Sequence, residues 1–124
     1  VGGGMYPGRP EDKHNFTLLL AEVRRQLDEL GAADGKHYLL TIAAPAGAGN
    51  AQNMERSEII KSLDWLNIMT YDLHGTWETS TNFNAPLYQA ENDPADASLN
   101  VHNIVQAYLK AGIPAEKLVM GVPF

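Results

Sequence analysis

The stretch that decides the fold is DWLNIMTYDLHGTWE, residues 64–78. It begins as an apolar run typical of a β-strand, and Tyr71 and Asp72 come at the far end of that run. The chain then turns through a glycine into a loop that carries Trp77 and Glu78. Polar side chains at the carboxyl end of a parallel strand are typical of function, and those at the opposite end are typical of structure. We therefore expect this strand to end in a functional site.

Helix and strand patterns alternate along the rest of the chain. Apolar residues at three- and four-residue spacing predict helices, and short, almost continuous apolar runs predict strands of a parallel sheet. The predicted helices cover residues 10–31, 53–62 and 98–111, the strands cover 37–44, 64–73 and 118–123, and loops cover 1–10 and 45–50. Gly31, just past the last apolar position of the first helix, is the expected stop of that helix. Strand, helix and strand at this spacing indicate βαβ units.

Side chains alternate between the two faces of a strand, which divides the central strand into two sets. Leu66, Ile68 and Thr70 suit packing under helices, whereas Asn67, Met69 and Tyr71 are larger and more polar, so we expect the second set to point toward the axis of a barrel, with Tyr71 nearest its top. Asp72 breaks this alternation and can share a pocket with Tyr71 only if the strand bulges or ends there. On the preceding strand, Thr41 and Ala43 are small residues expected at the same level, where they leave space for a ligand.

Composition narrows the possible partners. The 124 residues suffice for one domain, and 44% of them are hydrophobic, as in an ordinary globular protein. The formal net charge of −6 and the lack of a Lys or Arg run argue against a nucleic-acid or anionic-membrane partner. The four histidines lack metal-ligand spacing and there is no cysteine, so we expect no metal site. The sequence starts at Val1 and stops at Phe124 inside an apolar run, which suggests an excerpt of a longer chain.

The central stretch and its neighbours resemble a known family. Met69, Tyr71 and Asp72, followed by His74, Gly75, Trp77 and Glu78, resemble the sixth-strand signature of glycoside hydrolase family 18 chitinases, M-x-Y-D with a short Gly-Trp loop. RPEDKHNF, TIAAPAG, NAPLY and AGIPAEKLVMGVPF resemble, in order, segments from the end of the family's fourth strand to its seventh. The resemblance implies an α/β fold in which residues 1–124 form part of a single (β/α)₈ TIM barrel, roughly strands 5 to 7 with the helices between them.

The resemblance also implies a function. It is that of a secreted chitinase that hydrolyses β-1,4 linkages of N-acetylglucosamine polymers with retention, without a cofactor, a metal or a required protein partner. Enzymes of family 18 use the N-acetyl oxygen of the substrate as the nucleophile. Their general acid is the glutamate of a DxxDxDWE pattern, which we expect just upstream of Val1. The isolated chain is therefore expected to be inactive, and also poorly folded, because three strands leave two sheet edges open.

Residue roles follow from the same resemblance. Tyr71 would donate its hydroxyl to the N-acetyl carbonyl oxygen, and Asp72 would hydrogen-bond the same sugar. Met69 would form part of the pocket floor, and Trp77 would offer a flat apolar face to a neighbouring sugar ring. The remaining substrate-binding candidates are Ala43 and Glu78, with Phe83 and Tyr88 as weaker candidates on the long polar loop over residues 76–97.

Structural interpretations of the same residues stay open. Tyr71 could be a core tyrosine with a satisfied hydroxyl, Asp72 a turn cap, Trp77 an anchor of its own loop and Glu78 a surface charge. Two other functions also stay open: a catalytically inactive chitin-binding lectin on the same fold, and an unrelated flavodoxin-like domain that binds a small ligand. The residue at the upstream acid position distinguishes the enzyme from the lectin.

Overall fold

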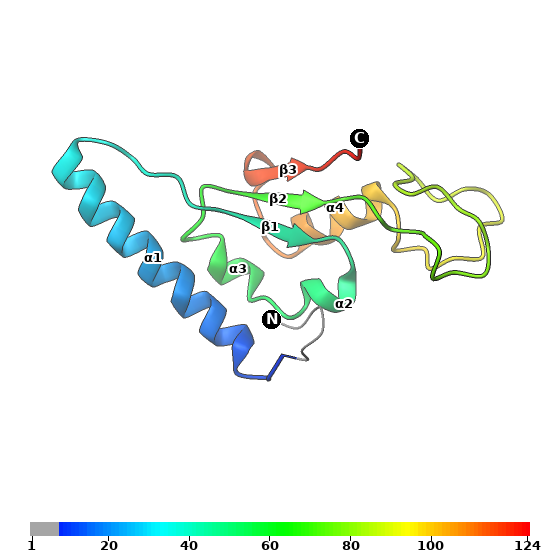
Figure 1. Ribbon diagram of the computed structural model, residues 1–124, viewed down its shortest axis with the longest axis horizontal. Helices are drawn as coiled ribbons and strands as arrows, with labels where there is room; N and C mark the ends of the chain where they lie inside the picture. The colour runs from blue at the N-terminus through cyan, green and yellow to red at the C-terminus, as the bar shows by residue number, and fades with distance from the viewer. Residues whose placement is uncertain (1–7) are drawn as a thin grey trace.

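The computed structural model describes residues 8–124, so most of the loop predicted over residues 1–10 lies outside it. Three parallel strands form one sheet in the order β1 (Thr41–Pro45), β2 (Trp65–Met69) and β3 (Leu118–Met120) (Figure 1). The helices are α1 (Asp12–Asp34), α2 (Ala48–Ala51), α3 (Arg56–Ile59), α4 (Val101–Lys110) and the 3₁₀ helix η1 (Ala115–Lys117). The predicted parallel βαβ arrangement is confirmed. Within residues 8–124, no helix is long and apolar enough to cross a membrane.

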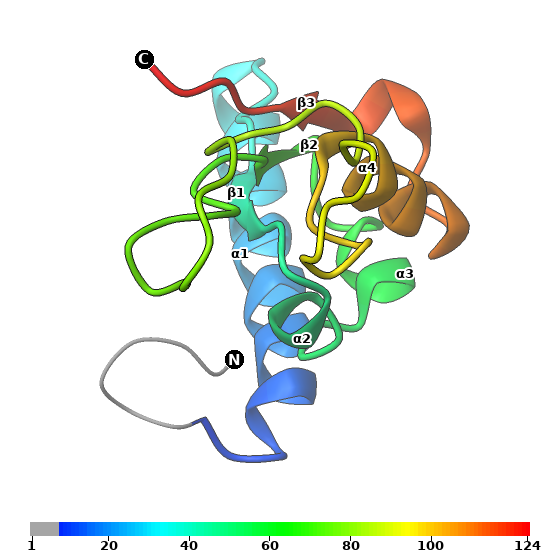
Figure 2. The same ribbon diagram turned by 90° about the vertical axis from the view of Figure 1, so that its right-hand side faces the viewer.

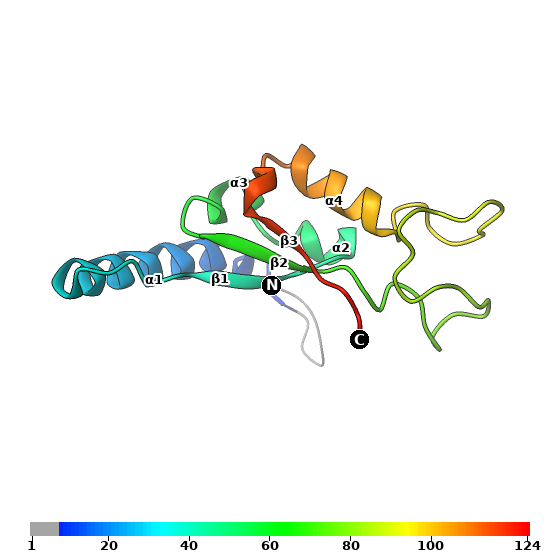
Figure 3. The ribbon, with the colours of Figure 1, turned by 90° about the horizontal axis from the view of Figure 1, so that it is seen from above.

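The helices cover one face of the sheet. Figure 3 shows α2, α3 and α4 on the same side of the three strands, with α1 running beside β1 and beyond it. Leu66, Ile68 and Thr70 point to the covered face and are almost completely buried. The alternate residues of the same strand lie on the other face, where Met69 is 38% exposed. The predicted division of the central strand is therefore confirmed, and its polar set faces away from the helices.

Tyr108 joins α4 to the end of β1. Its side chain is buried, and its hydroxyl donates a hydrogen bond of 2.6 Å to the carbonyl oxygen of Pro45. The guanidinium group of Arg56 lies 5.5 Å from the centre of the ring. Burial raises the pKa of Tyr108 to about 12, so the phenol stays neutral and remains a donor. This contact fixes the carboxyl end of the sheet against the helix layer.

Several element boundaries differ from the sequence prediction. The first helix does not stop at Gly31; it continues to Asp34 and ends at Gly35, whose φ of 65° is left-handed and whose N–H caps the carbonyl of Gly31. Gly31 lies inside the helix and is buried. Its lack of a side chain makes room for the carbonyl oxygen of Lys36, which would lie 2.3 Å from a Cβ at this position. Residues 48–50, predicted as loop, belong to α2 (Ala48–Ala51), and the helix predicted over 53–62 shortens to α3.

The first strand is shorter than predicted because strands form only where a partner is present. Thr41 pairs with Trp65, the first residue of β2, so the earlier residues have no strand beside them among those described. The N–H of Leu40 instead donates to the Asp64 carboxylate at 2.7 Å, and the N–H of Asp64 donates to the Leu40 carbonyl oxygen at 2.9 Å. This pair closes the amino end of the sheet.

Asp64 is the centre of a charged cluster at that end. Its carboxylate also lies 2.6 Å from Nε2 of His37 and 3.4 Å from the Arg24 guanidinium. Burial alone would raise the pKa of the Asp64 carboxyl, but hydrogen bonds from Leu40 and His37 and the charge of Arg24 outweigh it and hold the pKa below the usual 3.8. Groups at the amino end of barrel strands serve stability rather than chemistry.

Candidate active site

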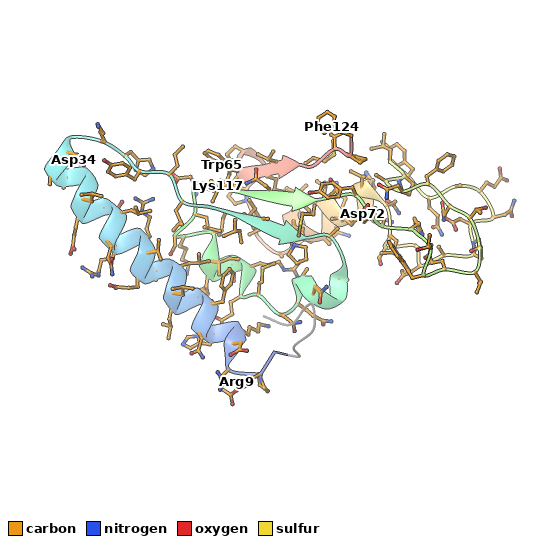
Figure 4. All side chains as sticks on the ribbon, viewed as in Figure 1. Arg9, Asp34, Trp65, Asp72, Lys117 and Phe124 are labelled. Carbon is orange, nitrogen blue, oxygen red and sulfur yellow. The ribbon has the colours of Figure 1, made fainter. Side chains whose placement is uncertain are left out.

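The long loop over residues 76–97 projects from the carboxyl end of the sheet. Figure 1 shows it beyond the tip of β2, and Figure 2 shows it in front of the sheet when the molecule is viewed along that direction. Figure 4 labels Trp65 near the start of β2 and Asp72 beyond its end. All the predicted site residues except Ala43 therefore follow or end β2. This arrangement places them where ligands bind in parallel α/β sheets.

Tyr71 is half-buried, and its ring packs on the backbone of Gly121. A Cβ at Gly121 would lie 2.7 Å from Cε1 of Tyr71 and 3.3 Å from Cδ1, so only glycine leaves room for the ring. The Tyr71 hydroxyl makes no hydrogen bond with any residue in the described part of the chain. The hydroxyl of Tyr38, by contrast, donates to Asp34 at 2.7 Å, and that of Tyr108 donates to Pro45. Tyr71 thus has a held ring and an available donor.

Two hydrogen bonds continue the pairing of β2 and β3 past the end of the ladder. The N–H of Gly121 donates to the carbonyl oxygen of Ile68 at 2.9 Å. The hydroxyl of Thr70, which is fully buried, donates to the carbonyl oxygen of Gly121 at 2.7 Å. Gly121 is therefore fixed against the strand that carries Tyr71, and it supports the phenol ring from below.

Asp72 adopts a left-handed backbone conformation with φ of 53°. Since β2 ends at Met69, Asp72 lies outside the strand, which is one of the two conditions under which it can join Tyr71 in a pocket. Its carboxylate Oδ1 accepts a hydrogen bond of 2.8 Å from the Asn84 amide, and its N–H donates to Asn84 Oδ1 at 3.2 Å. The N–H of Leu73 donates to the carbonyl oxygen of Asn84 at 2.9 Å. Asn84 thus holds this strained turn through three hydrogen bonds.

Met69 and Ala43 both lie on the face that no described helix covers, but at different levels. Met69 pairs with Pro45, and Ala43 pairs with Asn67. The expectation that Ala43 lies level with the whole polar set is therefore wrong for Met69 and Tyr71. Ala43 lies two residues nearer the amino end, about 7 Å deeper along the strand. It can leave space only at the floor of the site.

Trp77 and Glu78 belong to one compact turn. The N–H of Glu78 donates to the carbonyl oxygen of Gly75 at 3.1 Å, and the Trp77 ring lies on Gly75, where a Cβ would meet two ring carbons at 2.4 Å. The other side of the ring is open, since Trp77 is 67% exposed. The Glu78 carboxylate lies 3.0 and 3.2 Å from Nδ1 of the buried His74. Glu78 is therefore a paired, half-buried carboxylate rather than a simple surface charge.

The weaker aromatic candidates lie further along the loop. Phe83 is exposed, and the exposed ring of Tyr88 stacks at a tilt on His102, with centroids 5.2 Å apart. Near them, the amide of Asn82 donates to both oxygens of Asp93 at 2.9 and 3.0 Å, which lowers the pKa of that carboxyl. No group of three or more potential metal ligands gathers among residues 8–124.

Sequence reasoning missed three residues that shape the site. Gly121 carried a usable signal, because an isolated glycine inside a strand pattern often marks a close backbone approach. Asn84 opens the NAPLY segment of the family resemblance, but nothing in the local sequence indicates its partner 12 residues away. His74 belongs to the quoted signature, but nothing there indicates its second partner, the carbonyl oxygen of Leu99, which lies 25 residues away at 3.2 Å from Nε2.

Comparison with known proteins identifies the family of this chain. The sequence profile of the glycosyl hydrolases family 18 matches residues 5–124, and the chain belongs to this family. It is 50% identical over 131 aligned residues to chitinase A1 of Niallia circulans, covering the whole of this chain and 19% of that protein. The expected resemblance to family 18 chitinases is therefore confirmed.

Solved structures give the same result. The chitinase ChiA74 from Bacillus thuringiensis superposes with a TM-score of 0.92 at 51% identity, over 99% of this chain and 20% of that one. A mutant of catalytic domain 2 of the Ostrinia furnacalis group II chitinase, in complex with (NAG)5, superposes with a TM-score of 0.85 at 33% identity, over 94% and 29%. The chain thus spans about a fifth of chitinase A1 and of ChiA74, and the expected partial (β/α)₈ barrel is confirmed.

Proposed function

We propose that the complete barrel containing this chain is a chitinase that hydrolyses β-1,4 linkages between N-acetylglucosamine units with retention. Tyr71 and Asp72 orient and stabilise the N-acetyl group, and the general acid is a glutamate upstream of Val1. The observation that carries the proposal is the unpartnered hydroxyl of Tyr71 at the carboxyl end of β2, on the face free of described helices. The hydroxyls of Tyr38 and Tyr108, by contrast, donate to Asp34 and Pro45.

The chemistry suits a phenol. In family 18 the acetamido oxygen of the substrate attacks the sugar carbon, so charge develops on that acetamide as the bond to the leaving group breaks. A neutral O–H donor positions the acetamide oxygen for this attack without placing a charge in the empty site, and the positive charge that develops on the acetamide is stabilised by the Asp72 carboxylate. The ring of Tyr71 is already held on Gly121, so little orientation remains to be lost when the substrate binds.

Asp72 complements this donor. Asn84 occupies its Oδ1, while Oδ2 has no partner within residues 8–124 and can accept a hydrogen bond from the sugar or from its acetamide N–H. Because the carboxylate is held by Asn84, it presents this second oxygen in a defined direction. An acetamide aligned between Tyr71 and Asp72 would have its oxygen turned toward the reacting carbon.

The remaining candidates suit binding of a polymer. The open side of the Trp77 ring provides a flat apolar surface for a second sugar, and Met69 provides an apolar floor below the first. A related domain binds (NAG)5, which supports chito-oligomers as ligands. We assign Ala43 to the deepest part of this floor. Separately, we propose that the complete protein is secreted, on the basis of its family alone.

Tyr71→Phe in the complete barrel tests the proposal. Tyr71 orients the reacting acetamide, and a small misplacement of reacting groups costs about 10²-fold in rate, so we expect kcat to fall by that order with a small change in KM. Tyr38→Phe is the matched control, because it removes the hydroxyl of another half-buried tyrosine that lies before β1, away from the candidate site. An unchanged kcat would remove Tyr71 from the mechanism, and a wild-type barrel that binds chito-oligomers without cleaving them would show a lectin instead.

A further inference from the structure

The turn from His74 to Glu78 is closed twice. Its backbone is closed by the N–H of Glu78 on the carbonyl oxygen of Gly75, and its side chains are closed by the Glu78 carboxylate on Nδ1 of His74. Trp77 lies between these two closures, with its ring against Gly75. Loss of either the Glu78–Gly75 backbone hydrogen bond or the Glu78–His74 side-chain contact is therefore expected to move the Trp77 ring.

His74 connects this turn to the helix layer. Its side chain is 1% exposed, and its Nε2 lies 3.2 Å from the carbonyl oxygen of Leu99. Leu99 precedes Asn100, the buried residue that caps the amino end of α4 by accepting the N–H of Asn103 at 2.9 Å. The position of the turn is thereby set relative to α4 rather than by the loop alone.

Both nitrogens of the His74 ring face oxygen atoms that can only accept. The Leu99 carbonyl has no hydrogen to donate, and neither does an ionised Glu78 carboxylate. Each ring nitrogen of His74 therefore has its own oxygen partner, and the Glu78 carboxyl group and the buried imidazole form a hydrogen-bonded pair. Removing the Glu78 carboxyl group leaves Nδ1 of the buried His74 ring without its hydrogen-bond partner, which costs free energy and favours local opening of the turn.

We propose that the hydrogen-bonded pair of Glu78 and His74 is a positioning device that holds the Trp77 ring in the orientation in which it stacks on the second sugar. Glu78 itself does not contact the sugar. This inference rests on the proposed function, because it concerns the sugar surface of that site. It revises the sequence-based assignment of Glu78 as a direct substrate-binding residue.

A double-mutant cycle in the complete barrel separates the two roles. We expect Trp77→Ala to raise KM for a chito-oligomer about tenfold, Glu78→Ala to raise it by a similar factor with kcat within twofold, and Glu78→Ala to add less than twofold in the Trp77→Ala background. A direct contact between Glu78 and the sugar would instead give the same factor in both backgrounds, and that result would overturn the inference.

Two further variants guard against simple misfolding. Glu78→Gln keeps an acceptor for Nδ1–H, so KM should return to within about threefold of the wild type. Gly75→Ala leaves the hydrogen-bonded pair of Glu78 and His74 intact but places a Cβ against the Trp77 ring. The substitution should therefore raise KM when Trp77 is present and leave KM unchanged in the Trp77→Ala background. The control is Glu91→Ala, an exposed glutamate on the same loop, which should leave KM unchanged.

The outcomes also separate this inference from the proposed function. If Trp77→Ala leaves KM unchanged while Tyr71→Phe lowers kcat, the inference is wrong and the proposed chemistry stands. If the wild-type barrel binds the oligomer without cleaving it, the proposed hydrolysis is wrong, and the effects of the same substitutions are measured on Kd for the oligomer. A Glu78→Ala effect on Kd that disappears in the Trp77→Ala background would still support the positioning role. An equal effect in both backgrounds would overturn it.

Discussion

Asp72 and Asn84 hold each other through two hydrogen bonds, one from the Asn84 amide to the Asp72 carboxylate and one from the Asp72 N–H to the Asn84 amide oxygen. A third bond, from the N–H of Leu73 to the Asn84 carbonyl oxygen, closes the turn that follows β2. Asp72 has a positive φ, which a non-glycine residue keeps only where its surroundings enforce it. Asn84 therefore provides the constraint that keeps the proposed sugar-binding carboxylate in place.

Substitution of Asn84 tests this constraint. Asn84→Ala removes both side-chain bonds, and Asn84→Asp replaces the amide donor by a second carboxylate that repels Asp72, so we expect kcat/KM to fall about tenfold for alanine and further for aspartate. Steady-state kinetics on a chito-oligomer with the complete barrel provide the measurement. Asn50→Ala, an exposed position in α2, should have no effect. Wild-type kcat/KM in Asn84→Ala would show that Asp72 needs no such support.

Gly121→Ala tests the packing beneath Tyr71. The added Cβ would lie 2.7 Å from both the Tyr71 ring and the carbonyl oxygen of Ile68, so the ring must move. We expect kcat to fall at least tenfold and the free energy of unfolding to fall by about 1–3 kcal/mol, as for other overpacked sites. Gly49→Ala is the matched control, because a Cβ there meets nothing within 4 Å. Unaltered kcat in Gly121→Ala would mean that the ring position does not matter for turnover.

The Asp64 cluster predicts a pH dependence of stability. The pKa of Asp64 in the folded protein lies below the ordinary 3.8, so folding favours the carboxylate. The resulting stabilisation is fully present above the pKa of the unfolded chain and is lost as the pH falls through the lower folded value. Asp64→Asn should therefore reduce the free energy of unfolding by about 1–3 kcal/mol at neutral pH. The difference between wild type and variant should shrink below about pH 4.

Denaturant titrations of the complete barrel between pH 7 and pH 3 measure this difference. Glu91→Gln, which alters an exposed carboxylate on the loop over residues 76–97, is the control and should give a difference near zero throughout. A constant gap between the Asp64→Asn variant and the wild type down to pH 3 would contradict the assignment. The cause would then lie in packing rather than in the charge of Asp64.

Local periodicity was enough to predict much of the fold. The alternation of Leu66 and Ile68 with Asn67 and Met69 identified the buried face of β2, because successive side chains of a strand point to opposite sides whatever surrounds them. The position of Tyr71 and Asp72 at the end of that run identified the edge of the sheet where the candidate site lies. The family followed from the order of the motifs along the chain.

Only the tertiary structure decided the register and the partners. Ala43 lies opposite Asn67 rather than Met69 because of how β1 slides against β2, and no local pattern specifies that offset. The hydrogen bonds from Asn84 to Asp72 and from His74 to Leu99 join residues that are 12 and 25 positions apart in the sequence. The composition of the loop between them does not predict these contacts. The sequence by itself determined which strand carries the candidate site and which face that strand presents, since both depend on repeat distances of 2.0 and 3.6 residues. The folded chain decided how Tyr71, Asp72 and Trp77 are held, because close packing and hydrogen bonding act between residues that are neighbours only in space.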